Sequence, residues 1–314
     1  MYKNIEKKIV WDNPKIPKEY IHDLLKKDNS YVFTHVFLHL FTLFLTSYFL
    51  IFVSEISFTL FIVILMLHGM VYQFLGVAGA SHELYHNSPF SIKPLNKFFY
   101  YLFSFLLWNN PIIFSRSHKV HHKCSIHSDC DGEIDPNKKF NLKTFVNGIF
   151  NYESFINKIK NHFLNSIGKV RGDWVEVLGK NDEDKIFISN VKIWSRLLII
   201  GHMLLASIFI FFGQPLLILI ITFGSFFGNL VVILLAMGQH NLMPDKQNDF
   251  RKNSRTIILN PIIEFFYWSM NYHIEHSMYP KIPFYNLKKV RSILKQEMPE
   301  PTYGIYNLYK ILKN

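Results

Sequence analysis

Cysteine is almost absent from this chain, which has two in 314 residues. Cys124 and Cys130 lie close together and bracket His127. A disulfide or a small metal clip would fit this spacing. Thiols on the cytoplasmic side of a membrane stay reduced, however, so we expect two free cysteines.

Acidic residues are in the minority, with 23 Asp and Glu against 34 Lys and Arg and a net charge of +11. Such a charge suits nucleic acid or the anionic headgroups of a membrane. The basic residues flank apolar runs and form no recognised nucleic-acid motif, which excludes a nucleic-acid partner. A basic cytoplasmic surface on a membrane protein fits better, and 17% aromatic content agrees with it.

The first 30 residues lack a long apolar run and carry seven lysines, so we expect no cleavable signal peptide here. We interpret 1–30 as a basic cytoplasmic arm and 302–314 as a cytoplasmic tail. Between them, 31–301 is expected to form one membrane domain. The sequence shows neither low-complexity segments nor an internal repeat beyond two apolar hairpins.

Charge is missing altogether from residues 31–53. At about 1.5 Å per residue this run spans about 35 Å, enough to cross a bilayer core of about 30 Å. Three further apolar runs complete two hairpins. The predicted spans are therefore 31–53, 56–80, 197–212 and 215–237. Shorter apolar runs at 98–108 and 257–270 are expected to be interfacial helices.

The two tight hairpin loops, at Ser54-Glu55 and Gly213-Gln214, contain no lysine or arginine, whereas 1–30, 81–196 and 241–314 contain all 34. Because cytoplasmic loops are enriched in these residues, both tight loops are expected outside. The predicted fold is an all-α integral membrane protein, with four transmembrane helices in two hairpins, interfacial helices and a cytoplasmic histidine-rich cap. We expect a bacterial inner membrane, with both termini and the histidines cytoplasmic.

Eight of the 15 histidines form four short groups that follow these apolar runs. The most specific group places three imidazoles at i, i+3 and i+4, on one face of a helix. A zinc ion takes about four ligands, so eight donors suit two ions. Nitrogen donors without cysteine fit borderline metals such as iron better than calcium or magnesium. The candidate ligands are His82, His86, His118, His121, His122, His240, His273 and His276.

The segment His82-Glu83-Leu84-Tyr85-His86 also matches the zinc protease pattern, in which the glutamate is the general base. That chemistry needs one further ligand and leaves most of the other histidines without a role. If the histidines bind two metal ions instead, Glu83, Glu275 and Asp131 would orient ligand imidazoles through their second nitrogen. The histidines inside apolar runs are interpreted as structural: His35, His39, His68 and His202.

The order of these motifs resembles the membrane fatty acid desaturase and hydroxylase superfamily. His-x-x-x-His at 82–86 is followed by His-x-x-His-His at 118–122 and by Asn-Tyr-His-Ile-Glu-His at 271–276, interleaved with two membrane hairpins. The resemblance covers about Val71 to Pro301. It implies two iron ions, O2 as co-substrate, and desaturation or hydroxylation of an acyl chain or similar lipid. No fused haem or ferredoxin-like module is visible, so a separate ferredoxin, rubredoxin or cytochrome is expected to supply two electrons.

One position departs from the pattern of that superfamily. The third motif usually closes with His-His, and here Ser277 follows His276. A serine hydroxyl is a poor replacement for an imidazole on iron. His240 resembles the additional histidine found before the third motif and can help to keep the ligand count. Besides the zinc protease, a non-catalytic membrane protein with a degenerate metal site therefore remains an alternative.

Overall fold

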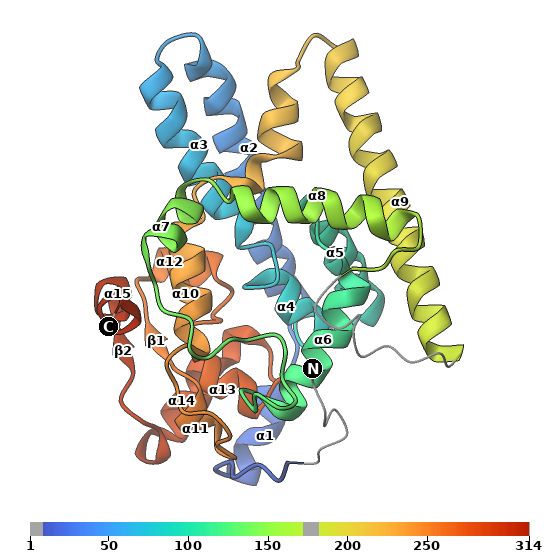
Figure 1. Ribbon diagram of the computed structural model, residues 1–314. Coiled ribbons are helices and arrows are strands. Elements are labelled where there is room, and N and C mark those ends of the chain that lie inside the picture. The colour runs from blue at the N-terminus through green and yellow to red at the C-terminus, as the bar shows by residue number, and fades with distance from the viewer. Residues whose placement is uncertain (1–8, 172–181, 314) are drawn as a thin grey trace.

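Helices make up most of this chain in the computed structural model, which describes residues 9–171 and 182–313. Residues 1–8 of the predicted basic arm lie outside the described residues. Long apolar helices extend from one end, and short helices and loops form the other, with α8 lying across between them (Figure 1). The helices of the first half are α1 (Lys18–Leu25), α2 (Asn29–Ser54), α3 (Phe58–Gln73), α4 (Ala80–Tyr85), α5 (Lys93–Leu106), α6 (Pro111–Cys124), α7 (Leu142–Ile149) and α8 (Tyr152–Ser166).

The second half begins with the long helix α9 and continues with shorter elements. They are α9 (Asp182–Phe211), a π-helical turn η2 (Ile218–Thr222), a 3-10 turn η3 (Gly224–Phe226), α10 (Leu230–His240), α11 (Phe250–Asn253), β1 (Ile257–Ile258), α12 (Pro261–Phe266), α13 (His273–Met278), η4 (Phe284–Asn286), α14 (Leu287–Ile293), η5 (Lys295–Glu297), β2 (Thr302–Tyr303) and α15 (Gly304–Lys313). Strands β1 and β2 pair in parallel, a small departure from the predicted all-α fold.

Among the described residues, two helices are long and apolar enough to cross a membrane, α2 and α9. Helix α2 contains the predicted span 31–53. The predicted span 56–80 corresponds to α3, which has 16 residues and gives way to turns before α4. Helix α9 includes 197–212 except its last residue, but begins at Asp182, because its amphipathic N-terminal half continues the same helix.

The predicted span 215–237 is broken rather than continuous. The chain leaves helical geometry between η2 and α10, where it packs closely against α3. Gly228 has a φ of +61°, and a Cβ there would lie 1.8 Å from the carbonyl oxygen of Met66. Gly224 packs tightly against His68, since a Cβ added at this glycine would lie 3.0 Å from the imidazole ring. Such close backbone approach requires glycine and interrupts the helix.

The two predicted interfacial helices have different outcomes. Residues 98–108 lie mostly within α5. Residues 257–270 contain β1, the short α12 and a turn, not one helix, because Asn260 caps α12 at Pro261 and both Trp268 and Ser269 have positive φ.

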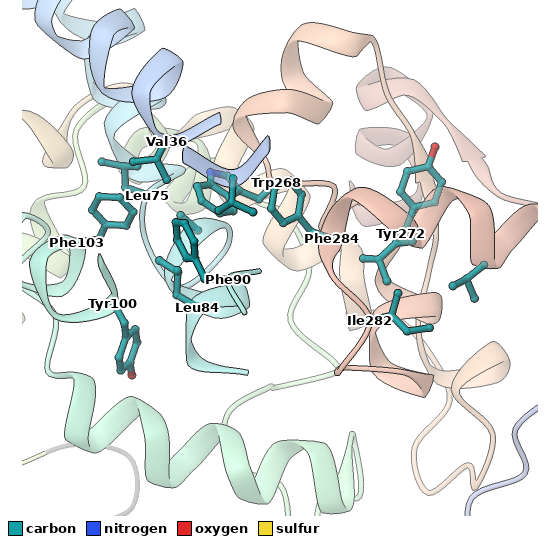
Figure 2. Close-up of a cluster of buried hydrophobic side chains, with 14 of the residues drawn as sticks. Val36, Leu75, Leu84, Phe90, Tyr100, Phe103, Trp268, Tyr272, Ile282 and Phe284 are labelled. Atoms are coloured by element: carbon teal, nitrogen blue, oxygen red, sulfur yellow. The ribbon is translucent and has the colours of Figure 1, made fainter. Parts of the chain in front are cut away.

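A continuous apolar core joins the N-terminal helices to the C-terminal segment. Leu84 of α4 and Phe90 pack in the same buried cluster as Trp268 and Phe284, as Figure 2 shows. Ile274 of α13 belongs to this cluster too. Because Leu84 and Ile274 share their helices with histidines, this packing positions the first and third histidine motifs.

The two cysteines correct the sequence-based expectation. Cys124 and Cys130 form a disulfide, with their Cα atoms 5.9 Å apart. Successive turns fold the chain back after α6, since the amide of His127 donates to Cys124 O and that of Cys130 to His127 O. The expectation of free thiols rested on the cytoplasmic compartment, whereas local turn geometry decides which side chains meet.

Candidate metal centre

Helix α6 begins where its sequence provides an N-terminal cap. The Asn110 side chain accepts hydrogen bonds from the amides of Ile112 and Ile113, and Pro111 occupies the first helical position. From this start the helix reaches the second histidine motif in its last two turns. His118 and His122 then lie beside His86, while His121 lies with His240 and His273.

The eight histidines predicted as ligands come together in two adjacent groups. In the first group, one nitrogen from each of four imidazoles lies within 4.8 Å of the others: His82, His86, His122 and His276. His118 adjoins this group, because its Nε2 lies 2.9 Å from His122 Nε2 and 3.2 Å from His86 Nε2. The second group meets the same 4.8 Å criterion and contains His121, His240 and His273.

Unshared electron pairs face one another in the first group. His82 Nδ1 lies 3.2 Å from Val77 O, and His276 Nδ1 lies 2.7 Å from Glu83 Oε1. Val77 O accepts a hydrogen bond, so His82 Nδ1 carries the hydrogen, and the negative charge of Glu83 favours a hydrogen on His276 Nδ1 as well; each Nε2 then exposes a lone pair. These two Nε2 atoms are 3.0 Å apart. Two facing lone pairs repel unless a cation lies between them, so this donor set fits a metal ion.

In the second group, two of the three imidazoles are oriented through Nδ1. His240 Nδ1 is 3.0 Å from Asn253 O, which leaves its Nε2 as an acceptor, and this Nε2 lies 2.8 Å from His273 Nε2. His121 Nδ1 lies 2.8 Å from Asp131 Oδ2, so its Nε2 is likewise directed to the group. All three imidazoles are buried. The second group is therefore suited to a metal ion but supplies fewer nitrogens than the first.

Carboxylates behind the imidazoles fix their orientation. Glu83 contacts His276 and Asp131 contacts His121, at the distances given above. Glu133, which the sequence did not single out, holds His118 Nδ1 at 2.9 Å from its Oε1. The only clue in the sequence was its position two residues after Asp131. In the structure its amide donates a hydrogen bond to Asp131 Oδ1.

Glu275 lies in a different environment from the one anticipated in the sequence. Its carboxylate oxygens lie 3.0 Å from Arg291 Nη1 and 2.6 Å from Thr256 Oγ1. These contacts join α13 to α14 and to the segment before β1. In this position Glu275 stabilises the helix that carries His273 and His276.

Burial sets the protonation of the centre. It lowers the pKa of five imidazoles well below the ordinary value, and the neighbouring histidines lower it further: His82, His86, His118, His122 and His273. Burial also opposes the charged form of His121, but the charge of Asp131 and the hydrogen bond to it raise that pKa to about 9. Most donors are therefore neutral and ready to bind a cation near neutral pH.

A pH dependence of the metal-free protein follows from these five lowered pKa values. Their unfolded-state pKa is about 6.5, so below that pH the unfolded chain binds protons that the folded chain refuses. Stability should thus fall as the pH drops from about 7 toward 5, and the raised pKa of His121 should lower it more gently as the pH rises from 7 toward 9. Thermal unfolding of metal-stripped protein at pH 5, 6, 7 and 8 measures this. A melting temperature that rises between pH 7 and pH 5 would contradict the assignment.

Other histidines lie outside the two groups and satisfy backbone carbonyls. His35, His39 and His202 contact Phe265 O, Val71 O and Phe105 O at 2.9 to 3.0 Å. His68 contacts Ile220 O at 3.1 Å. His127 contacts Cys124 O and the Asn248 side chain. These contacts agree with structural roles.

Comparison with known proteins identifies the family of this chain. The family model described as "Fatty acid desaturase" matches residues 56–309. The chain is also 25% identical over 245 residues to a Delta(6)-fatty-acid desaturase of Caenorhabditis elegans, covering 69% of this chain and 54% of that protein. It thus spans about half the length of this curated relative. Because the family model covers most of the chain, including all eight clustered histidines, the chain belongs to the fatty acid desaturase family.

Proposed function

We propose that this protein is a membrane di-iron oxidase that uses O2 and two electrons to desaturate, or hydroxylate, an acyl chain or similar lipid. The observation that carries this proposal is the pair of adjacent imidazole groups, each with nitrogens that converge in a buried space. Eight nitrogen donors suit two borderline metal ions. Membership of the desaturase family supports the reaction class.

In this proposal the two groups divide the ligands unequally. The first ion would be held by His82, His86, His118, His122 and His276, and the second by His121, His240 and His273. Two bound irons would supply the O2-activating redox chemistry that removal of hydrogen from an unactivated C–H bond requires. Asp131 and Glu133 keep the hydrogen on Nδ1 of their partners, and the negative charge of Glu83 favours the same tautomer of His276, so that each Nε2 stays available.

An apolar groove next to the third histidine motif supports an acyl substrate. The groove has a volume of about 660 Å³ and lies between α1 and the chain that leaves α13. Ile21 and Leu25 line one wall, and Met278, which follows Ser277 directly, lines the other. Such a surface suits a hydrocarbon chain on its way to the centre.

For the whole chain we propose four membrane crossings in two hairpins, with both termini and the metal centre cytoplasmic. The apolar helices α2, α3, α9 and α10 support this arrangement. A basic cytoplasmic face would attract an acidic electron donor such as a ferredoxin, rubredoxin or cytochrome.

The zinc protease alternative requires Glu83 to act as a free general base. In the structure Glu83 is fully buried, and its carboxylate contacts His276 Nδ1 and the Ser88 hydroxyl. A carboxylate held by two partners and orienting an imidazole is poorly placed to activate water. This observation favours the oxidase.

Metal content tests the proposal directly. We expect about two irons per chain in protein purified from iron-supplemented cells, and new or lost double bonds or hydroxyl groups in the lipids of cells that express it. Elemental analysis and lipid mass spectrometry measure these. One zinc per chain would indicate the protease instead, and substoichiometric metal with unchanged lipids would indicate a degenerate, non-catalytic site.

Ser277 gives a second prediction. It is buried on α13 four residues after His273, so the two side chains share a helix face next to the second group. Ser277→His should restore a nitrogen donor and raise iron occupancy, while Ser277→Ala should retain both irons with at most a modest loss of activity. Iron analysis of the two variants measures this. Loss of a whole equivalent of iron from Ser277→Ala would show that the hydroxyl is itself required.

A further inference from the structure

A second groove lies between α5 and α9, which stand next to each other in Figure 1, and none of the eight clustered histidines lines it. Its volume is about 750 Å³. Aromatic and aliphatic side chains form most of the lining, among them Phe98, Tyr101, Leu102, Phe105 and Trp194. The proposed reaction uses none of these residues.

The groove runs along α9 from its charged half to its uncharged half. The Tyr101 ring lies 5.2 Å from the Trp194 ring, and Phe105 O lies 3.0 Å from His202 Nε2. Helix α5 therefore advances in the same direction as α9. Charged residues of α9 end at Arg196, and 197–211 contain none. The Phe105 end of the groove thus lies at the level expected for membrane lipid, and the opposite end at the level of charged residues.

Lysines gather at that opposite end. Lys93 and Lys97 line the groove together with Asn87. Lys27 donates from Nζ to Asn87 O at 2.5 Å, which holds a third ammonium group at this end. Burial lowers the pKa of Lys27, and the nearby charge of Lys93 lowers it further. The positive charges of Lys27 and Lys93 are therefore close enough to repel each other, and Lys97 lines the same groove.

No carboxylate balances these charges within the described part of the chain, where the ion pairs involve other residues. The Lys97 Nζ lies 5.8 Å from the centroid of the Tyr101 ring. Repelling cations at the mouth of an apolar groove complement a ligand with an anionic head and a hydrocarbon tail.

We propose that this groove binds an anionic phospholipid, with its phosphate at Lys27, Lys93 and Lys97 and one acyl chain along Phe98, Leu102 and Phe105. The bound lipid is distinct from the substrate of the metal centre. It would fill the space between α5 and α9 and neutralise the lysines. The proposal does not depend on the di-iron assignment, because it uses no residue of the two histidine groups.

Quenching of tryptophan fluorescence by brominated lipid tests this site, because Trp194 lines the groove. The full chain is reconstituted in phosphatidylcholine vesicles that contain increasing fractions of brominated phosphatidylglycerol or of brominated phosphatidylcholine. We expect half-maximal quenching at a several-fold lower fraction of the anionic lipid. Trp194→Phe should remove this high-affinity component, which assigns it to the groove rather than to the other tryptophans.

Lysine variants show whether charge is the cause. Lys93→Gln/Lys97→Gln should abolish the preference for phosphatidylglycerol, whereas Lys288→Gln/Lys289→Gln, an exposed pair on α14, should keep it. Equal far-UV circular dichroism and metal content confirm that each variant is folded. Equal quenching by both brominated lipids in the unaltered chain, or a preference that survives Lys93→Gln/Lys97→Gln, would overturn the proposal.

Discussion

Alanine in place of His121 is expected to abolish turnover and to remove most of one equivalent of iron. The second histidine group has three imidazoles, so this change leaves two, too few to hold an ion firmly. It also leaves Asp131, whose carboxylate lies 2.8 Å from His121 Nδ1, buried without its partner. Loss of a buried ion's partner costs about 3–5 kcal/mol, so thermal stability should fall too.

Iron analysis and product formation on the same preparation measure the result. His127→Ala is the matched control, because His127 is buried nearby but lies outside both groups, bonded to Cys124 O and Asn248. We expect that variant to keep both irons. Full iron retention in His121→Ala would refute the assignment of the second group.

The Glu83→Gln variant should bind iron about 10- to 100-fold more weakly, with activity falling in parallel as iron is lost. Glutamine keeps the size of the side chain but removes the negative charge that faces His276 Nδ1 at 2.7 Å. The imidazole then becomes a weaker donor to the first ion. Competition with a chelator of known affinity measures the change, and added iron should restore part of the activity.

Glu275→Gln provides the matched control for Glu83→Gln. Both acids are fully buried, yet Glu275 contacts Arg291 and Thr256. Its replacement should lower stability and leave iron affinity nearly unchanged. A zinc protease predicts another pattern, in which Glu83→Gln abolishes activity while metal remains fully bound. Equal loss of iron affinity in both variants would show that Glu83 has no special role.

Local sequence spacing is sufficient to predict the candidate ligands of the site. The spacing of His118, His121 and His122 places all three near one face of any helix, whatever surrounds it. Glu83 was a candidate for orienting an imidazole because it lies between two histidines of the same motif. Glu275 met the same criterion, but α14 supplies Arg291 as its partner, and Arg291 is 16 residues away in the sequence.

The helical, apolar character of the chain, its family and the eight clustered histidines follow from composition, spacing and motif order, which are local properties of the sequence. The division of these histidines into groups of five and three, in contrast, arises from long-range contacts in the folded chain. That division depends on contacts such as His82 with His276, which are 194 residues apart. Tertiary packing likewise broke the helix before α10 and brought Glu133 to His118, because both depend on where the folded backbone brings side chains together.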